Sequence, residues 1–386
     1  MFRRIAILTI ATLALVSCSK DDHEPAPEPT RVLLVYVGTD NNLAGYEQEK
    51  LQALRDGWTG RPTDHIVVYR DTRGAPARLM EISNLAPGEQ PRELATYGTE
   101  NSASPQILTR VINEVVGLYP ADSYGLLVFS HASGWLPEGA FDELSRGIVP
   151  STLHARGRSV IVDGSDEMEL ADFAAAIPDG VFDYIVLEAC FTAGIEVAYQ
   201  LRGKAPYILA SSAEIVHPGF APVYAQATKK LFTENLAGFG QDAFDHTLTY
   251  AESNPQRSAT LSVIRTAGLD ALADFVRENC DFSREVDAAD IQRFDRLNVG
   301  HVFFDFGDYY SRLLDTDAQR AQLDRLIADC VSWKASTQEF MTQQPGYNGF
   351  PISSHCGLTT YIPQLRFGGL NTAYTELMWT QTIDPI

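Results

Sequence analysis

The segment YGLLVFSHASGW, residues 124–135, is an apolar run that ends at a polar Ser-His pair. A continuous apolar run of this length is typical of a strand that is buried on both faces of a sheet. A second segment, DYIVLEACFTAG at residues 183–194, has the same form and ends at Cys190. The sequence therefore predicts two buried strands. The first is followed by His131 and the second by Cys190, and both side chains are of types that act in catalysis.

Further strands and helices alternate on both sides of these two segments. Apolar runs predict strands at residues 32–37, 65–69 and 207–210. Helical spacing predicts helices at residues 46–55, 105–118, 169–177 and 195–201. This alternating order indicates an α/β fold, a mostly parallel sheet with helices on both faces.

The last third of the chain has a more helical pattern. It predicts helices at residues 241–252, 267–280 and 317–333, and strands at 261–264 and 358–362. We found no internal repeat and no linker in it. We therefore expect one large domain at residues 31–386, with a helix-rich C-terminal extension.

His131 and Cys190 are expected at the same edge of the sheet, since both follow the carboxyl ends of predicted strands. Ligands of parallel sheets bind at that edge. The start of a helix after Cys190 favours a thiolate, and an imidazole titrates near neutrality. The pattern predicts a nucleophilic cysteine with a histidine partner. The alternative is a structural cysteine, because cysteine is among the most buried residue types.

Seven segments carry a resemblance to one family. Residues 124–135 resemble a block in which a strand leads to His-Gly-Ser-Gly-Trp, and residues 183–194 resemble one in which a strand ends in Asp-Ala-Cys. Other similar blocks lie at residues 36–43, 196–201, 210–219, 357–363 and 370–374. Their order and spacing resemble the clostripain family of cysteine peptidases. The resemblance implies a caspase-like α/β/α sandwich and endopeptidase activity on peptide or protein substrates.

The resemblance also implies roles for residues of the two main blocks. Cys190 would attack the scissile carbonyl, and His131 would protonate the leaving amine. The backbone N–H groups of Ala132 and Cys190 would hold the oxyanion. Ala132 replaces the glycine of the family pattern, and alanine resists a positive φ. This departure favours the alternative function, a catalytically impaired lipoprotein of the same fold that acts in binding.

Cleavage after Arg or Lys is a further implication of the resemblance, with acidic residues in the S1 pocket, the site for the residue before the scissile bond. Glu188 is the first candidate, because it stands where the family has Asp. Glu214 is the second candidate and Asp183 is the third. The extra methylene of Glu188 would shift the pocket toward Lys or loosen its specificity. The alternative for these carboxylates is a solvated or salt-bridged side chain.

Family members mature by cleavage between the His and Cys blocks. The corresponding segment here, Leu136 to Ser159, carries Arg146, Arg156 and Arg158. These three residues are candidate self-cleavage sites. The alternative is an ordinary surface loop.

The N-terminus has the form of a lipoprotein export signal. Residues 1–17 combine a basic start with an apolar run, and Leu15-Val16-Ser17-Cys18 resembles a lipobox. We expect the signal peptide to end before Cys18, which carries the lipid, and residues 18–30 to form a flexible tether. An acidic run at residues 19–24 resembles surface-export tags. The sequence thus predicts a lipid-anchored protein of the outer membrane in the cell envelope, the alternative being plain secretion. The acidic run leaves two alternatives open, display at the cell surface and a solvated tether.

Charge and cysteine usage narrow the choice of partners. A net charge of −20 argues against nucleic acid, which is bound by clustered Lys and Arg. The cysteines show no CxxC motif, so no zinc site is indicated. No cofactor is expected. Some relatives are associated with calcium. Residues 163–167 offer oxygen ligands, but their spacing is not that of an EF-hand loop, so they support a calcium site only weakly.

Overall fold

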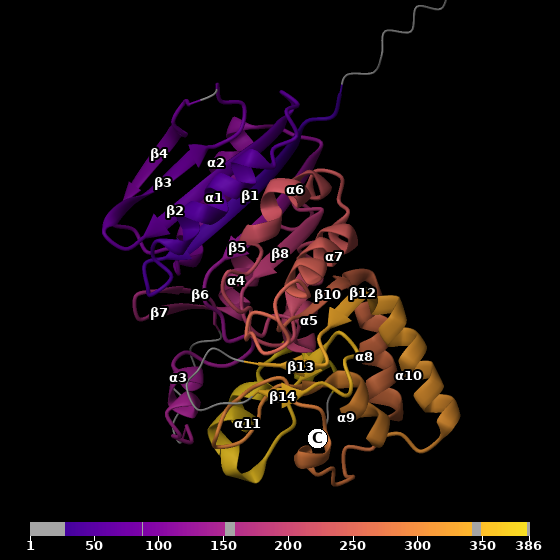
Figure 1. The fold of residues 1–386 in the computed structure, drawn as a ribbon. Coiled ribbons are helices and arrows are strands. Elements are labelled where there is room, and N and C mark those ends of the chain that lie inside the picture. Colours follow the sequence, from indigo (N-terminus) through magenta and orange to yellow (C-terminus); the bar gives the residue numbers. More distant parts are fainter. Residues whose placement is uncertain (1–27, 87, 151–158, 342–348, 384–386) are drawn as a thin grey trace, which may run out of the picture.

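A nine-stranded sheet forms the centre of the computed structural model, which describes residues 28–86, 88–150, 159–341 and 349–383 (Figure 1). Across the sheet, the strands follow the order β12 (Val331–Ser336), β10 (Thr260–Arg265), β9 (Tyr207–Ser211), β8 (Tyr184–Glu188), β5 (Ser123–Phe129), β1 (Arg31–Thr39), β2 (Asp64–Thr72), β3 (Ala75–Glu81) and β4 (Arg92–Gly98). The five strands from β9 to β2 run parallel, and antiparallel strands flank them on both sides. The predicted mostly parallel sheet is thus confirmed at its centre.

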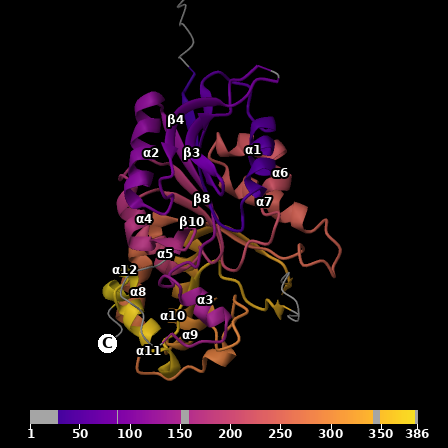
Figure 2. The same cartoon turned by 90° about the vertical axis from the view of Figure 1, so that its left-hand side faces the viewer.

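Helices cover both faces of this sheet (Figure 2). One face carries α1 (Tyr46–Asp56), α6 (Ala221–Leu231) and α7 (Leu236–Thr247). The other carries α2 (Pro105–Leu118), α4 (Leu170–Ala176), α5 (Ile195–Gln200) and α8 (Leu269–Asn279). Alternate residues of β1 enter the two cores, Leu33 on the side of α1 and Leu34 on the side of α2. Burial on both faces explains why the central strands read as unbroken apolar runs.

Helix α2 shows how directly local sequence sets an element. It begins at Pro105, whose fixed φ and missing N–H suit the first turn of a helix. Its apolar residues recur at helical spacing, and all five that face the sheet are buried: Ile107, Leu108, Val111, Ile112 and Val115. The predicted bounds, residues 105–118, agree with the structure.

The C-terminal third is joined to the sheet and does not form a separate body. It supplies β10 and β12 to the sheet. It also forms β11 (Phe304–Asp305), α9 (Phe306–Arg312), α10 (Asp317–Cys330), β13 (Glu339–Phe340), β14 (Phe350–Pro351), β15 (Thr359–Thr360), α11 (Gly368–Thr375) and α12 (Met378–Ile383). Thr359 donates its N–H to the carbonyl of Ala193, just after Cys190. The late segments therefore pack against the loop that carries the candidate nucleophile.

Two predicted elements differ from the structure. The helix expected at residues 317–333 ends at Cys330, because the next residues pair with β10 as β12. The helix expected at 241–252 begins five residues earlier, where the Asn235 side chain accepts the N–H of Gly238 and caps α7. Within the described residues, no helix is long and apolar enough to cross a membrane.

Candidate active site

His131 and Cys190 lie beyond the carboxyl ends of two neighbouring parallel strands. Strand β5 pairs with β8 in a register that sets Phe129 beside Glu188. His131 and Cys190 each follow two residues later, so the backbone delivers them to adjoining positions. We call this side of the sheet the carboxyl edge. The placement predicted from the two apolar runs is thus the one that the chain adopts.

The loops that carry these two residues are in direct contact at Gly134. A Cβ atom at this position, where φ is +64°, would lie 2.4 Å from the carbonyl oxygen of Phe191. Only glycine tolerates so close an approach together with a positive φ. Phe191, the residue after Cys190, itself has a φ of +59°. Such a conformation is costly for an aromatic residue and is characteristic of functional sites.

The His131 ring is held by an amide from another loop. Its Nε2 lies 2.5 Å from Oδ1 of Asn42, in the segment that follows β1. Burial disfavours the charged imidazolium and lowers the pKa of His131, while the Asp142 carboxylate opposes this effect. Asn42 was not singled out from the sequence, although the block at residues 36–43 contains it. An amide oxygen at this distance orients the ring.

The Cys190 sulfur accepts a hydrogen bond from the backbone N–H of Ile215 at 3.4 Å. Burial raises the pKa of the Cys190 thiol to about 12, and the nearby Glu214 carboxylate adds to the rise. The Ile215 bond and the Arg296 charge partly oppose it. Among the described residues, no hydrogen bond joins the His131 ring to this sulfur. Burial thus disfavours the charged form of both groups, the thiolate of Cys190 and the imidazolium of His131.

The backbone N–H groups of Ala132 and Cys190 are candidate oxyanion donors. Within the part of the chain that the structure describes, neither has an internal acceptor. Ala132 is not among the described non-glycine residues with positive φ, which are Asn84, Phe191 and Glu234. The positive φ falls on Gly134 instead. Alanine at position 132 is therefore accommodated without backbone strain.

Glu188 is buried in a network of its own. Its carboxylate pairs with the ammonium of Lys50 from α1 and accepts the Phe220 N–H at 2.7 Å and the Tyr224 hydroxyl at 2.5 Å. Glu188 is 2% exposed and Lys50 is 5% exposed. With three internal donors, this carboxylate is poorly placed to bind a substrate cation. Lys50 was not identified as part of the site, because nothing local in the sequence marks its distant partner.

Glu214 lies beyond the end of β9, next to the nucleophile. Its two oxygens are held by the guanidinium of Arg296, with Nε at 2.9 Å from Oε1 and 3.1 Å from Oε2. A terminal nitrogen of Arg296 lies 2.8 Å from Oε1. The Glu214 side chain is 19% exposed and the Arg296 side chain 14% exposed. Like Lys50, Arg296 was not singled out from the sequence.

Asp183 lies away from the site. It immediately precedes β8, at the amino end of the strand, and its carboxylate accepts the N–H of Tyr124 at 3.1 Å. The full length of the strand separates it from Cys190, about 16 Å at 3.3 Å per residue. A place in the S1 pocket is incompatible with this position, and the prediction for Asp183 is corrected.

The segment between the His and Cys blocks holds a short helix, α3 (Ala140–Ser145), and a hairpin of β6 (Ser159–Asp163) and β7 (Asp166–Glu169). Arg146 follows α3 and is exposed. Arg156, Arg158 and Cys18 lie outside the described residues. Asp163 turns inward to bond Ser102. Within the described ranges, no three His, Cys, Asp or Glu side chains gather in a way that could hold a metal ion.

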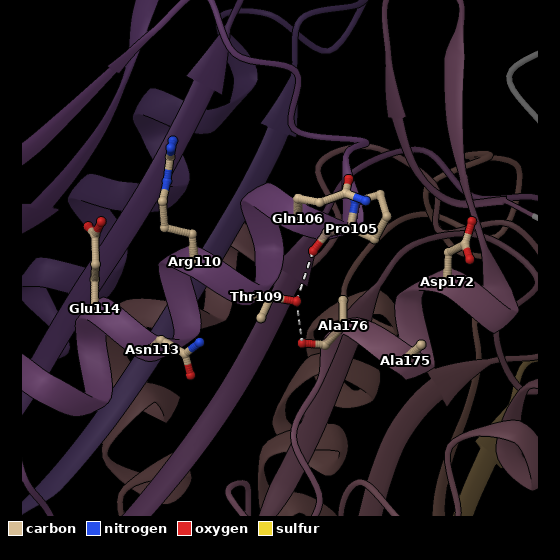
Figure 3. Close-up of a pocket in the computed structure, with 9 residues that line it drawn as sticks. All are labelled: Pro105, Gln106, Thr109, Arg110, Asn113, Glu114, Asp172, Ala175 and Ala176. Atoms are coloured by element: carbon tan, nitrogen blue, oxygen red, sulfur yellow. Dashed lines mark hydrogen bonds between the residues drawn. The ribbon is translucent and has the colours of Figure 1, made fainter.

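A groove of about 690 Å³ lies elsewhere, between α2 and α4 (Figure 3). Thr109 lies in it and bonds the carbonyls of Pro105 and Ala176. At the carboxyl edge, a small cavity beside Glu214 has a volume of only about 30 Å³. This is room for one or two water molecules and not for an arginine side chain. This cavity alone therefore does not admit an arginine side chain.

Comparison with known proteins places this site in context. A family model described as the clostripain family matches residues 35–343. The chain is 24% identical over 240 residues to clostripain of Hathewaya histolytica, covering 55% of this chain and 43% of that protein. It thus spans less than half the length of that curated relative.

Solved structures match over nearly the whole chain. An inactive zymogen of a C11 protease from Parabacteroides distasonis is 30% identical, with a TM-score of 0.79 over 92% of this chain and 99% of that one. A secreted C11 cysteine protease from Bacteroides thetaiotaomicron, solved with an irreversible peptide inhibitor, is 23% identical. Its TM-score is 0.77, over 92% of this chain and 99% of that one. These matches confirm the expected caspase-like sandwich.

Proposed function

We propose a specific activity for this chain, which belongs to the clostripain family of cysteine proteases. It is an endopeptidase of the cell envelope, and it cleaves peptide bonds that follow basic residues. The observation that carries the proposal is the register of β5 and β8, which sets His131 and Cys190 at adjoining positions of the carboxyl edge. The contact of their loops at Gly134 supports it. No other described cysteine is presented in this way beside a histidine at the end of a parallel strand.

The proposed reaction follows from these groups. The Cys190 thiol passes its proton to the neutral His131 ring as its sulfur bonds to the scissile carbonyl carbon, and the carbonyl π electrons move to the oxygen. The N–H groups of Ala132 and Cys190 stabilise that oxyanion. His131 then donates the proton to the leaving amine nitrogen, and the C–N bond breaks. Water, deprotonated by His131, hydrolyses the thioester.

Glu214 is the S1 acid in this proposal. It lies beside Cys190, and its carboxylate already accepts a guanidinium group from Arg296. Glu188, the first candidate from the resemblance, would support the pocket wall from behind, because Lys50 and Tyr224 occupy its oxygens. This arrangement favours cleavage after Arg, whose planar fork matches a carboxylate, over cleavage after Lys.

Maturation and location extend the proposal. The exposed Arg146 is the described candidate for self-cleavage, since it directly follows α3 in a surface segment. Membrane attachment would come from a lipid on Cys18 at the outer membrane, and its support is the lipobox-like sequence alone. Neither feature needs a cofactor.

Peptide hydrolysis tests the proposed activity. Residues 19–386, the chain without signal peptide and lipid, are assayed with fluorogenic peptides that end in Arg, Lys or Ala. We expect cleavage after Arg and Lys, and a loss of roughly a thousandfold or more in kcat/KM in both Cys190→Ala and His131→Ala. Full activity in Cys190→Ala would contradict the assignment. No hydrolysis of any peptide, even after nicking within residues 136–159, would favour the binding lipoprotein.

A further inference from the structure

Arg296 holds Glu214 in the way that a substrate arginine would. The guanidinium fork reaches both carboxylate oxygens through three short contacts of 2.8 to 3.1 Å. Paired N–H donors on one carboxylate form the strongest common arrangement for recognition of a guanidinium group. Because these bonds already fill the face of the carboxylate, Glu214 cannot hold Arg296 and an incoming arginine in the same way at once.

The pair lies against the nucleophile. Ile215, the residue after Glu214, donates its N–H to the Cys190 sulfur, and both charges of the pair act on the pKa of Cys190. The segment that carries Arg296 also covers the next residue of the Cys190 loop, because the Phe303 ring stacks on Phe191 at 4.4 Å. Arg296 and the segment that carries it therefore lie close to the nucleophile.

The backbone around Arg296 is held independently of its side chain. Asp295, 1% exposed, accepts the N–H groups of Leu297, Val302 and Phe303 at 3.0, 2.8 and 3.0 Å. These bonds tie residues 295–303 into a loop, the Arg296 loop, that presents this arginine. Among the described residues, the Arg296 guanidinium bonds only Glu214. The side chain can thus leave the carboxylate while the loop stays in place.

We infer that Arg296 is a built-in occupant of the S1 pocket, which a substrate arginine must displace before cleavage. The inference rests on the proposed endopeptidase function and deepens it. Displacement is possible because a substrate guanidinium rebuilds on Glu214 the bonds that Arg296 gives up, so the carboxylate is not left without a cation. Arg296 thereby reduces affinity for basic substrates without abolishing it, by roughly tenfold. An arginine substrate, which can rebuild the fork, displaces it better than a lysine substrate.

Kinetics of Arg296→Ala test this role, with Arg293→Ala as the matched control. Arg293 carries the same charge three residues earlier but contacts His301 and lies over the Phe350 ring. We expect KM for an arginine peptide to fall about tenfold in Arg296→Ala. KM for an alanine peptide should stay unchanged, and Arg293→Ala should behave as wild type. An unchanged or raised KM for the arginine peptide in folded Arg296→Ala would overturn the inference.

Binding of benzamidine, a small amidinium ion, provides a readout that needs no turnover. Calorimetry is performed in the Cys190→Ala background with and without Arg296→Ala, and a thermal melt confirms that each variant is folded. We expect at least about tenfold tighter binding when Arg296 is removed. Equal binding would overturn the inference even if peptides are cleaved. Tighter binding without any peptide cleavage would support the S1 occupant and count against the proposed activity alone.

Discussion

Two ion pairs flank Cys190 at the carboxyl edge, and they differ in how they are held. Lys50–Glu188 is sealed, with side chains 7% and 1% exposed, whereas Arg296–Glu214 is at 14% and 19%. Lys50 also donates to the carbonyl of Pro218 at 2.9 Å and lies over the Phe129 ring. Arg296 has Glu214 alone among the described residues. The first pair is part of the core, whereas the second is the pair in which we propose that a ligand replaces the cation.

The difference shows that an acidic residue near a nucleophile is not by itself a specificity pocket. Glu188 is closer to Cys190 in sequence, yet its oxygens face inward to Lys50, Phe220 and Tyr224. Even a small addition is blocked there, since a Cβ at Gly219 would lie 2.4 Å from a Glu188 oxygen. The Glu214 side chain is partly exposed to solvent, and it is held by a single side chain among the described residues, that of Arg296. Burial and the number of partners, and not sequence distance, decide which carboxylate can serve a substrate.

The largest expected effect concerns stability. Lys50→Met leaves a buried carboxylate without its cation, and breaking a buried pair in this way costs about 3–5 kcal/mol of unfolding free energy. Arg296→Met removes the cation from a pair that keeps partial contact with solvent, so the loss should be smaller, about 1–2 kcal/mol. Urea unfolding of both variants measures the contrast. Equal losses would show that the two pairs are not different in kind.

Substrate choice should separate the two carboxylates with a smaller effect. Glu214→Gln is expected to lower kcat/KM for an arginine peptide by roughly 10- to 100-fold, because a charged hydrogen-bonded pair with the substrate is lost. Cleavage after alanine should be unchanged. Glu188→Gln should lower cleavage of both peptides together, because the buried Lys50 loses its anionic partner. If Glu188→Gln alone removes the preference for arginine, the assignment of the S1 acid is reversed.

Local patterns predicted the parts of the fold that bring the catalytic candidates together. Helix α2 is buried on one face, which gives apolar residues at helical spacing. Strands β5 and β8 are buried on both faces, which gives unbroken apolar runs. The antiparallel strands β3 and β4 were missed, because they lie at the edge of the sheet and mix exposed with buried residues. A half-exposed strand alternates buried with exposed residues and leaves no unbroken apolar run.

The candidate site was only partly predictable for a different reason. His131 and Cys190 are marked by the strands that precede them, but their surroundings come from distant segments. Lys50 lies 138 residues from Glu188, and Arg296 lies 82 residues from Glu214. Asp183 was misplaced because closeness in sequence to Cys190 ignored the length of the intervening strand. Only the three-dimensional structure shows which charges neutralise one another.

Labelling with an irreversible inhibitor tests the central claim most directly. Wild-type, Arg296→Ala and Cys190→Ala chains are treated with a peptidyl-arginine chloromethyl ketone, and the adduct is mapped by mass spectrometry over time. The proposed site predicts a single adduct on Cys190, formed about tenfold faster in Arg296→Ala and absent in Cys190→Ala. An adduct on another cysteine, or no adduct at all, would contradict Cys190 as the nucleophile. Equal rates with and without Arg296 would contradict its occupation of the S1 pocket.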